Sequence, residues 1–336
     1  MEAPLGTDPT TVEGVDAQGI PCDYCHKVWA VRLDPSTSRP FPHAPGVLST
    51  ELRRPPPGEQ LFMGPLDDVA PGHDAYSALH RESAFCAPCH FGVFWDTLVY
   101  GSYAEWLDSA YSDPETGRTC QDCHMPRTGA THFVRPDKGG LERDPSTIFG
   151  HAMPGADDDE LLREAVRLEV EVRRDGEEIA VRVAITNDGA GHHVPTDSPL
   201  RHLLLLVEAT DAAGAPLVRR EGPLLPRWAG EGDPAEGSYA GRPGKAYAKV
   251  LREDWTGLAP TGAYWNPTSV VSDNRLAPFV TDESRYVFGA PAGGELSVRV
   301  RLLFRRAFLE LARRKGWEQQ DRVMAERTLR LAAPAP

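Results

Sequence analysis

The 336-residue chain lacks the long apolar segments that cross membranes. Its longest apolar run, Leu203 to Val207, is far shorter than the roughly 20 residues that a transmembrane helix needs. The N-terminus, MEAPLGTDPTTVEG, has neither the basic stretch nor the apolar stretch of a secretory signal peptide. The sequence as given therefore predicts neither a transmembrane segment nor an export signal.

Basic residues are scarce in the first half of the chain. Residues 1–160 contain 11 Lys and Arg against 25 Asp and Glu, whereas residues 161–336 contain 25 against 24, and the net charge is −13. Because phosphate binding requires clustered Lys and Arg, the acidic half argues against a nucleic-acid partner. Its charge either steers association toward a basic protein partner or only keeps the protein in solution.

No cysteine lies outside a close pair. The six cysteines form three Cys-x-x-Cys pairs, each directly followed by histidine, in CDYCH (22–26), CAPCH (86–90) and CQDCH (120–124). At this spacing two thiols form thioethers with the two vinyl groups of one haem, and the adjacent histidine becomes the proximal iron ligand. The pattern therefore predicts three covalently attached haem c groups. The residues that would hold them are Cys22, Cys25, Cys86, Cys89, Cys120, Cys123, His26, His90 and His124.

Zinc, redox dithiols and structural disulfides are the alternatives for these cysteines. A structural zinc site takes four ligands, so two pairs would fill one site and the third pair would be left over. A thioredoxin-like Cys-x-x-Cys requires a βαβ context, which this sequence does not predict. Haem is therefore the preferred interpretation. Because c-type haem is attached outside the cytoplasm, we expect a periplasmic or extracellular protein whose export signal has been removed or is missing.

The character of the sequence changes near residue 157, which divides the chain into two expected domains, 1–156 and 157–336. The first is rich in Pro, Gly and His, and its clearest helix candidate is Phe91 to Tyr111. The second has alternating strands, with Asp175-Gly176 as a hairpin turn. We expect strands at 168–173, 179–186, 202–210, 216–220, 296–304 and 327–331, a helix that begins at 157–160, and a short helix at 307–315.

These elements predict an α+β fold class. A loop- and helix-containing multihaem cytochrome c domain is expected to precede an antiparallel, roughly immunoglobulin-like β-sandwich. The first domain has too little regular structure to build a core from its side chains alone. Large apolar cofactors held by covalent bonds would supply one.

Eight histidines remain beyond the three proximal positions. A second imidazole on a haem iron gives a six-coordinate centre suited to electron transfer, whereas an open position permits ligand chemistry. His73 and His80 precede the second motif, His151 precedes the domain junction, and His192 stands in a loop beside Gly189 and Gly191. At each position, an ordinary surface or hydrogen-bonded histidine is the alternative.

Several segments resemble a family of bacterial multihaem cytochromes c, across about residues 15–336. The most specific are LHRESAFCAPCH, TCQDCHMP and GAGHHVPT, and the segment FGHAMPG also matches. The haem domain is similar to those of the tetrahaem cytochromes of ammonia oxidisers and, more distantly, of the nitrite reductase and hydroxylamine oxidoreductase group. The resemblance implies a C-terminal β-sandwich and assigns four distal-ligand positions, His80, His151, His192 and His73.

This chain departs from that family at its start. Family members carry a further Cys-x-x-Cys-His ahead of the segment that matches CDYCH, and here it is missing. We expect either that one haem was lost or that the chain is incomplete at its N-terminus. The family also has a segment like Asp273-Asn274-Arg275, to which the residues themselves assign no role.

Two functions are compatible with these motifs. An electron-transfer protein passes electrons between haems and redox partner proteins, whereas an enzyme opens one haem to a small nitrogen or sulfur compound. The nitrite reductase family replaces one motif histidine with lysine, but all three motifs here keep histidine. Electron transfer is therefore preferred, and no catalytic residue is assigned.

Overall fold

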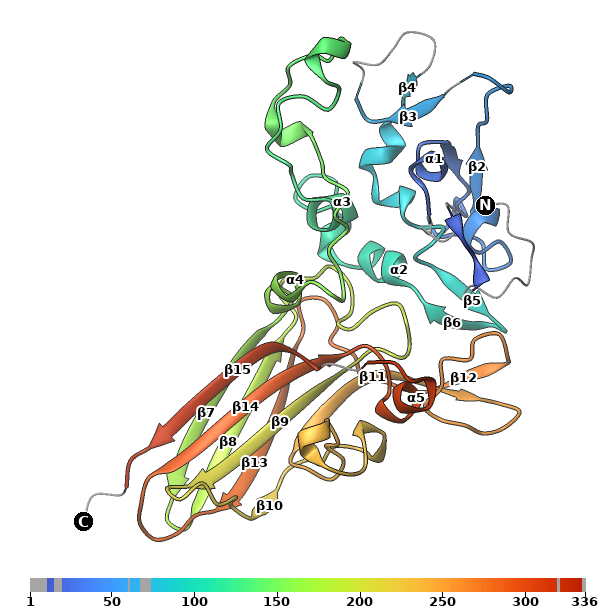
Figure 1. Cartoon of the computed structure of the whole chain (residues 1–336). Coiled ribbons are helices and arrows are strands. Elements are labelled where there is room, and N and C mark those ends of the chain that lie inside the picture. The colour runs from blue at the N-terminus through green and yellow to red at the C-terminus, as the bar shows by residue number, and fades with distance from the viewer. Residues whose placement is uncertain (1–10, 15–19, 60, 67–73, 319–320, 334–336) are drawn as a thin grey trace. The chain divides into compact units, whose positions relative to one another are not determined.

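The computed structural model describes residues 11–14, 20–59, 61–66, 74–318 and 321–333 (Figure 1). The chain forms two compact units, Met1–Phe91 with Thr119–Met153, and Gly92–Arg118 with Pro154–Pro336. It therefore passes from one unit to the other three times. The segment Gly92–Arg118, which joins the second and third cysteine pairs, belongs to the second unit, whereas the expected range 1–156 contains it and the other expected range is 157–336. As functional domains, the two expected ranges remain a prediction.

The first unit consists of short elements joined by loops. Two small sheets pair β1 (Val28–Val31) with β2 (Thr50–Leu52) antiparallel, and β3 (Phe62–Gly64) with β4 (Asp74–Tyr76) parallel. Its helices are α1 (Cys22–Cys25), α3 (Cys120–His124) and the 3-10 turns η3 (Gly46–Ser49), η4 (Ala78–Arg81), η5 (Ser83–Phe85), η7 (Pro136–Lys138) and η8 (Pro145–Thr147). In the described parts of the chain, no helix has the length and apolar character needed to cross a membrane.

The second unit is built on two antiparallel sheets. The order is β10-β13-β8-β7 in one sheet and β12-β11-β9-β14-β15 in the other. The strands are β7 (Arg167–Asp175), β8 (Glu178–Thr186), β9 (His202–Asp211), β10 (Arg219–Glu221), β11 (Gly244–Glu253), β12 (Thr268–Asp273), β13 (Thr281–Gly289), β14 (Leu296–Arg305) and β15 (Arg322–Leu331). Helices α4 (Asp159–Glu164) and α5 (Leu309–Lys315) and the 3-10 turns η9 (Arg227–Ala229) and η10 (Pro234–Glu236) complete it. The fold is thus mixed, with mainly antiparallel sheets and few helices.

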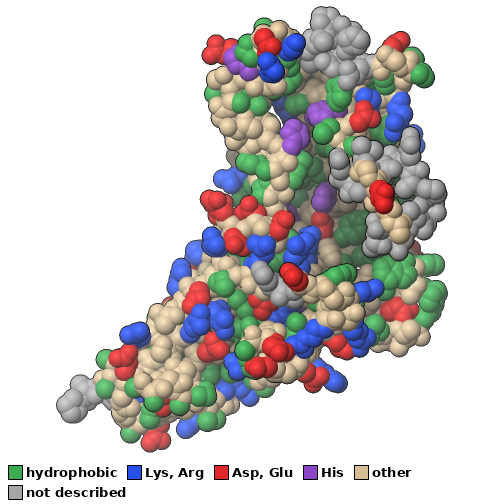
Figure 2. Space-filling view, in the orientation of Figure 1, with side chains coloured by type: hydrophobic (Ala, Val, Ile, Leu, Met, Phe, Trp, Pro, Cys, Tyr) green, Lys and Arg blue, Asp and Glu red, His purple; other side chains and the backbone are tan. Residues whose placement is uncertain are grey.

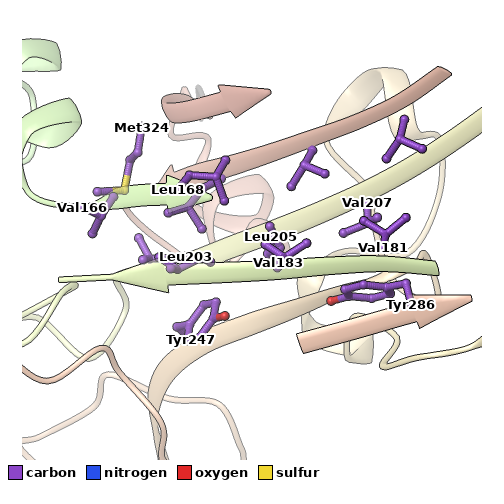
Figure 3. Close-up of a cluster of buried hydrophobic side chains, with 14 of the residues drawn as sticks. Val166, Leu168, Val181, Val183, Leu203, Leu205, Val207, Tyr247, Tyr286 and Met324 are labelled. Carbon is purple, nitrogen blue, oxygen red and sulfur yellow. The ribbon is translucent and has the colours of Figure 1, made fainter. Parts of the chain in front are cut away.

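One apolar core joins the facing sides of these two sheets (Figure 3). Alternate residues of β8, such as Val181 and Val183, are fully buried in it, as period-two side-chain alternation requires. Leu203, Leu205 and Val207 of β9 enter the same core from the other sheet. The intervening residues of β9 are buried in a second apolar cluster on its other face, so this strand is apolar without alternation.

The expected helix from Phe91 to Tyr111 is wrong over most of its length. Its first half is a hairpin of β5 (Gly92–Phe94) and β6 (Thr97–Tyr100), and only α2 (Ser102–Leu107) and the 3-10 turn η6 (Ala110–Ser112) are helical. Trp95 and Asp96 have φ of 51° and 60°, the left-handed values that a tight two-residue hairpin turn requires. Gly92 lies where a Cβ would come 2.3 Å from the Tyr100 ring, so the paired strands need glycine there.

Most of the other expected elements are confirmed. β7 and β8 form the predicted hairpin, β9, β14, α4 and α5 occupy their expected segments, and β15 begins earlier than expected. The expected strand at 216–220 is only the three-residue β10. Strands β11, β12 and β13 lie in a region of the sequence for which no strand was predicted. β11 is buried along almost its whole length and β12 is mostly exposed, so neither alternates, and β13 begins with polar and charged residues.

Leu205 offers a direct test of this core. We expect Leu205→Ala to lower the free energy of unfolding of the second unit by about 2–5 kcal/mol, because the substitution leaves a cavity between the two sheets. Leu258→Ala is the matched control, because Leu258 is 56% exposed, and its effect should stay within about 0.5 kcal/mol. Denaturant unfolding followed by circular dichroism measures both. Equal effects of the two substitutions would contradict the described packing.

Candidate haem-binding site

Each Cys-x-x-Cys-His segment forms one helical turn. In the first, which contains α1, the amide of His26 donates to the carbonyl of Cys22 at 3.0 Å. In the second, the amide of His90 donates to the carbonyl of Cys86 at 3.1 Å, and the third segment is α3 itself. Residues i, i+3 and i+4 of a helical turn share one face. Both thiols and the imidazole of each segment are therefore carried on the same side of the backbone.

The third turn is stabilised by a capping box. The Thr119 side chain accepts a hydrogen bond from the amide of Asp122 at 3.3 Å, and the Asp122 carboxylate accepts one from the amide of Thr119 at 2.8 Å. This reciprocal pair satisfies two amides that a helix start otherwise leaves unbonded. Local sequence thus explains why a helix begins at TCQDCH.

The second and third turns are joined by hydrogen bonds inside the first unit. The amide of Cys120 donates to the Ser83 hydroxyl at 3.0 Å, and the buried Gln121 side chain donates to the carbonyl of Glu82 at 2.9 Å. The neighbouring thiol of Cys120, together with burial, raises the pKa of the Cys86 thiol. Two cysteines that belong to different motifs therefore lie next to each other.

His26 is held in one tautomer by the strand β3. Its Nδ1 lies 2.8 Å from the carbonyl oxygen of Met63, which only accepts hydrogen bonds, so Nδ1 carries the proton. The amide of Met63 in turn donates to the carbonyl of His26 at 2.8 Å. A protonated Nδ1 leaves Nε2 as the lone-pair nitrogen, and this is how proteins orient histidines that bind metals.

His80 and His151 both lie close to His26. The ring centroid of His26 is 5.9 Å from that of His80, at an interplanar angle of 16°, and 6.1 Å from that of His151, at 46°. Two imidazoles that bind one metal ion from opposite sides have ring centroids a similar distance apart, since two metal–nitrogen bonds of about 2.0–2.1 Å each are lengthened by the distance from each nitrogen to its ring centre. In the described residues no group of three or more His, Cys, Asp and Glu side chains converges on one point, so these histidines meet in pairs.

The chemistry of these two histidines suits a metal ligand. Nε2 of His80 lies 3.1 Å from the carbonyl of Cys25, whereas its Nδ1 is buried without a hydrogen-bond partner. Desolvation lowers the pKa of His80 and also that of His151, although His151 is the more exposed of the two. A lowered pKa keeps the imidazole neutral, which is the form that binds metals. The residues present therefore fit the haem ligation that the sequence predicts.

The structure brings together only part of the predicted ligand set. His26, His80 and His151 meet in the first unit, and His90 and His124 lie in its other motif turns. His192 belongs to the second unit, where its Nδ1 lies 2.9 Å from the carbonyl of His193. His73 lies outside the described residues. Ligation by His73 and His192 therefore stays a prediction.

The sequence analysis did not identify the groups that support these histidines. Met63 acts through its backbone carbonyl, which any residue supplies, so no sequence signal marks it. Gln121 stands inside a motif and is buried, and its position between two cysteines was the available signal. Glu105 was also missed, although its buried partner Arg275 lies in a segment that resembles the cytochrome family.

No protein-family model matches this chain, and no curated protein matches it. A PapD-like domain of human CEP192 superposes with a TM-score of 0.16 at 9% identity, over 61% of this chain and 92% of that one, and so low a score does not show a shared fold. The crystal structure of a penta-haem cytochrome c552 from Thermochromatium tepidum superposes with a TM-score of 0.64 at 19% identity, over 92% of this chain and 76% of that one. The chain therefore shares the fold of a multihaem cytochrome c over most of its length.

Proposed function

We propose that this protein is an electron-transfer multihaem cytochrome c that carries three covalently bound haems. One observation supports the proposal above all others: three Cys-x-x-Cys-His segments each form a helical turn that places both thiols and the imidazole on one face. The shared fold with a multihaem cytochrome is a second, independent support.

In this proposal the motif cysteines attach the haems and the histidines bind the haem iron. Cys22 with Cys25, Cys86 with Cys89, and Cys120 with Cys123 would each attach one haem, above His26, His90 and His124 respectively. When bound, haem supplies a one-electron iron couple whose potential depends on its axial ligands. The protein orients the ligands, as Met63 does for His26, and keeps His80 and His151 neutral. Distal ligation by His80, His151, His192 and His73 is part of the proposal.

The wider setting follows from the same chemistry. The haem-bearing range 1–156 would precede an immunoglobulin-like β-sandwich in 157–336, in a protein matured in the periplasm or outside the cell. The 25 acidic against 11 basic residues of positions 1–160 favour redox partner proteins with basic surfaces. Association with such a partner should weaken as ionic strength rises, because salt screens exposed charges.

Removing one pair of thiols tests the attachment sites. We expect the double variant Cys22→Ser/Cys25→Ser, matured in the periplasm, to carry two covalent haems instead of three, because a CxxCH site holds its haem through both cysteines. Asp23→Asn is the matched control, since it alters the same turn at an exposed residue and keeps both thiols. Intact-mass spectrometry counts the haems. An unchanged mass increment in the double variant would refute the assignment.

Histidine variants test the distal ligands and separate electron transfer from catalysis. The ferric wild-type protein should be mainly low-spin, because two imidazoles on an iron leave no open site. His80→Ala, His151→Ala and His192→Ala should each open a haem to carbon monoxide, whereas the exposed His43→Ala should not. Visible spectra with and without carbon monoxide report this. Three unchanged spectra would sink the ligand assignment, and a wild-type protein that already binds carbon monoxide would favour the enzyme.

A further inference from the structure

The segment between the second and third cysteine motifs does not fold with them. His90 and Cys120 belong to the first unit, whereas Gly92–Arg118 packs into the second unit with its two sheets. Lys249 of β11, only 6% exposed, donates from its Nζ to the carbonyl of Leu98 at 2.8 Å. Charged side chains buried in the second unit thus hold this connecting segment.

The strongest of these attachments is the carboxylate of Glu105 in α2. Its Oε1 accepts from Nη1 of Arg275 at 2.7 Å, and its Oε2 accepts from the amide of His193 at 3.2 Å and from the Thr196 hydroxyl. Arg275 is also paired with Asp273 at 2.8 Å. One carboxylate therefore joins the connecting segment to β12 and to the loop that carries His192 and His193.

This ion pair differs from those on the surface of the same unit. Figure 2 shows Lys and Arg interspersed with Asp and Glu there, and a pair such as Arg182–Glu283 is about half exposed. Glu105 and Arg275 are each only 7% exposed. Burial works to raise the pKa of Glu105, but the imidazole of His193, whose Nδ1 lies 3.6 Å from the carboxylate, and the charge of Arg275 outweigh it and hold the pKa well below its usual value. The carboxylate therefore stays charged and buried, where loss of one partner is costly.

In the loop that contacts Glu105, the peptide group between His192 and His193 is hydrogen-bonded at both its carbonyl and its amide. The carbonyl of His192 accepts from Nδ2 of Asn187 at 2.8 Å, and the amide of the same peptide group is the one that donates from His193 to Glu105. Gly191 packs against Tyr111 of the connecting segment so closely that a Cβ would lie 2.4 Å from Cδ2 of the ring. The backbone that carries His192 has little freedom to turn.

We infer that Glu105 is a positioning residue for His192. It binds the His192–His193 peptide to the segment that runs directly from the second motif to the third, so that the imidazole of His192 is presented in one orientation. The inference rests on the proposed function, because it supposes that His192 is a haem ligand. It adds a carboxylate that acts on this ligand through the backbone of the loop that carries it.

Glu105→Gln tests the inference, because it keeps the shape of the side chain and removes its charge. In the haem-loaded protein we expect the amides of residues 189–196 to exchange with solvent about tenfold faster, since a charge-assisted hydrogen bond is weakened. The same variant should bind carbon monoxide at the haem that His192→Ala opens. Thr196→Val, which removes a single donor to the carboxylate, should give a smaller change in the same direction.

Glu208→Gln is the matched control. Glu208 of β9 also pairs with two arginines, with Nη1 of Arg242 at 3.1 Å and Nη2 of Arg301 at 3.0 Å, but it makes no contact with the His192 loop among the hydrogen bonds of the described residues. It should leave both the exchange of residues 189–196 and the carbon monoxide spectrum as in wild type. Because Glu208 is 30% exposed and Glu105 only 7%, denaturant unfolding of both Gln variants measures any general loss of stability separately.

The outcomes separate this inference from the proposed function. Wild-type exchange of residues 189–196 in Glu105→Gln overturns the inference, whatever the haems do. Faster exchange without carbon monoxide binding, while His192→Ala binds it, also overturns it, because the loop then presents His192 without the carboxylate. If His192→Ala itself binds no carbon monoxide, the ligand assignment in the proposed function fails, and the inference fails with it.

Discussion

The described part of the first unit contains few buried apolar side chains. Among its described residues, the buried hydrophobic side chains are Val28, Met63, Ala87, Phe91 and Ile148, whereas both apolar clusters of the protein lie in the second unit. A compact unit with so small a core is usually stabilised by disulfides, metals or cofactors. The cysteine turns and the neutral histidines are the groups that would hold such cofactors, and the three proposed haems would provide the missing apolar volume.

The second unit, in contrast, has an extensive apolar core of its own. Two sheets bury a continuous core, and the connecting segment Gly92–Arg118 is held to them by buried charges. The chain enters this unit after Phe91, at the end of the second motif, and leaves it after Arg118, at the start of the third motif. These buried charges hold the segment that links the second and third motifs to the sheets of the second unit, and the role inferred for Glu105 is to hold the His192 loop to that segment.

Spacing and periodicity predicted the parts of this protein that depend on local sequence. The β7–β8 hairpin and the unbroken apolar run of β9 follow from rules that act within a few residues. Helical turns at the Cys-x-x-Cys-His segments were not among the predictions, although their spacing of three and four residues matches one helical turn. The hairpin at Trp95 was mistaken for a helix, because apolar residues in so short a segment satisfy both periods. The supports of the site were missed for another reason: the carbonyl of Met63 and the buried carboxylate of Glu105 gain their roles only from contacts with residues distant in sequence.

The central claim is that each of the three motifs carries a covalently bound haem. A pyridine haemochrome spectrum of the purified, periplasmically matured protein, measured against protein concentration, tests it most directly. The account predicts a c-type spectrum with three haems per chain. A colourless protein that contains zinc at its cysteines, or one whose cysteines are paired as disulfides, would contradict it.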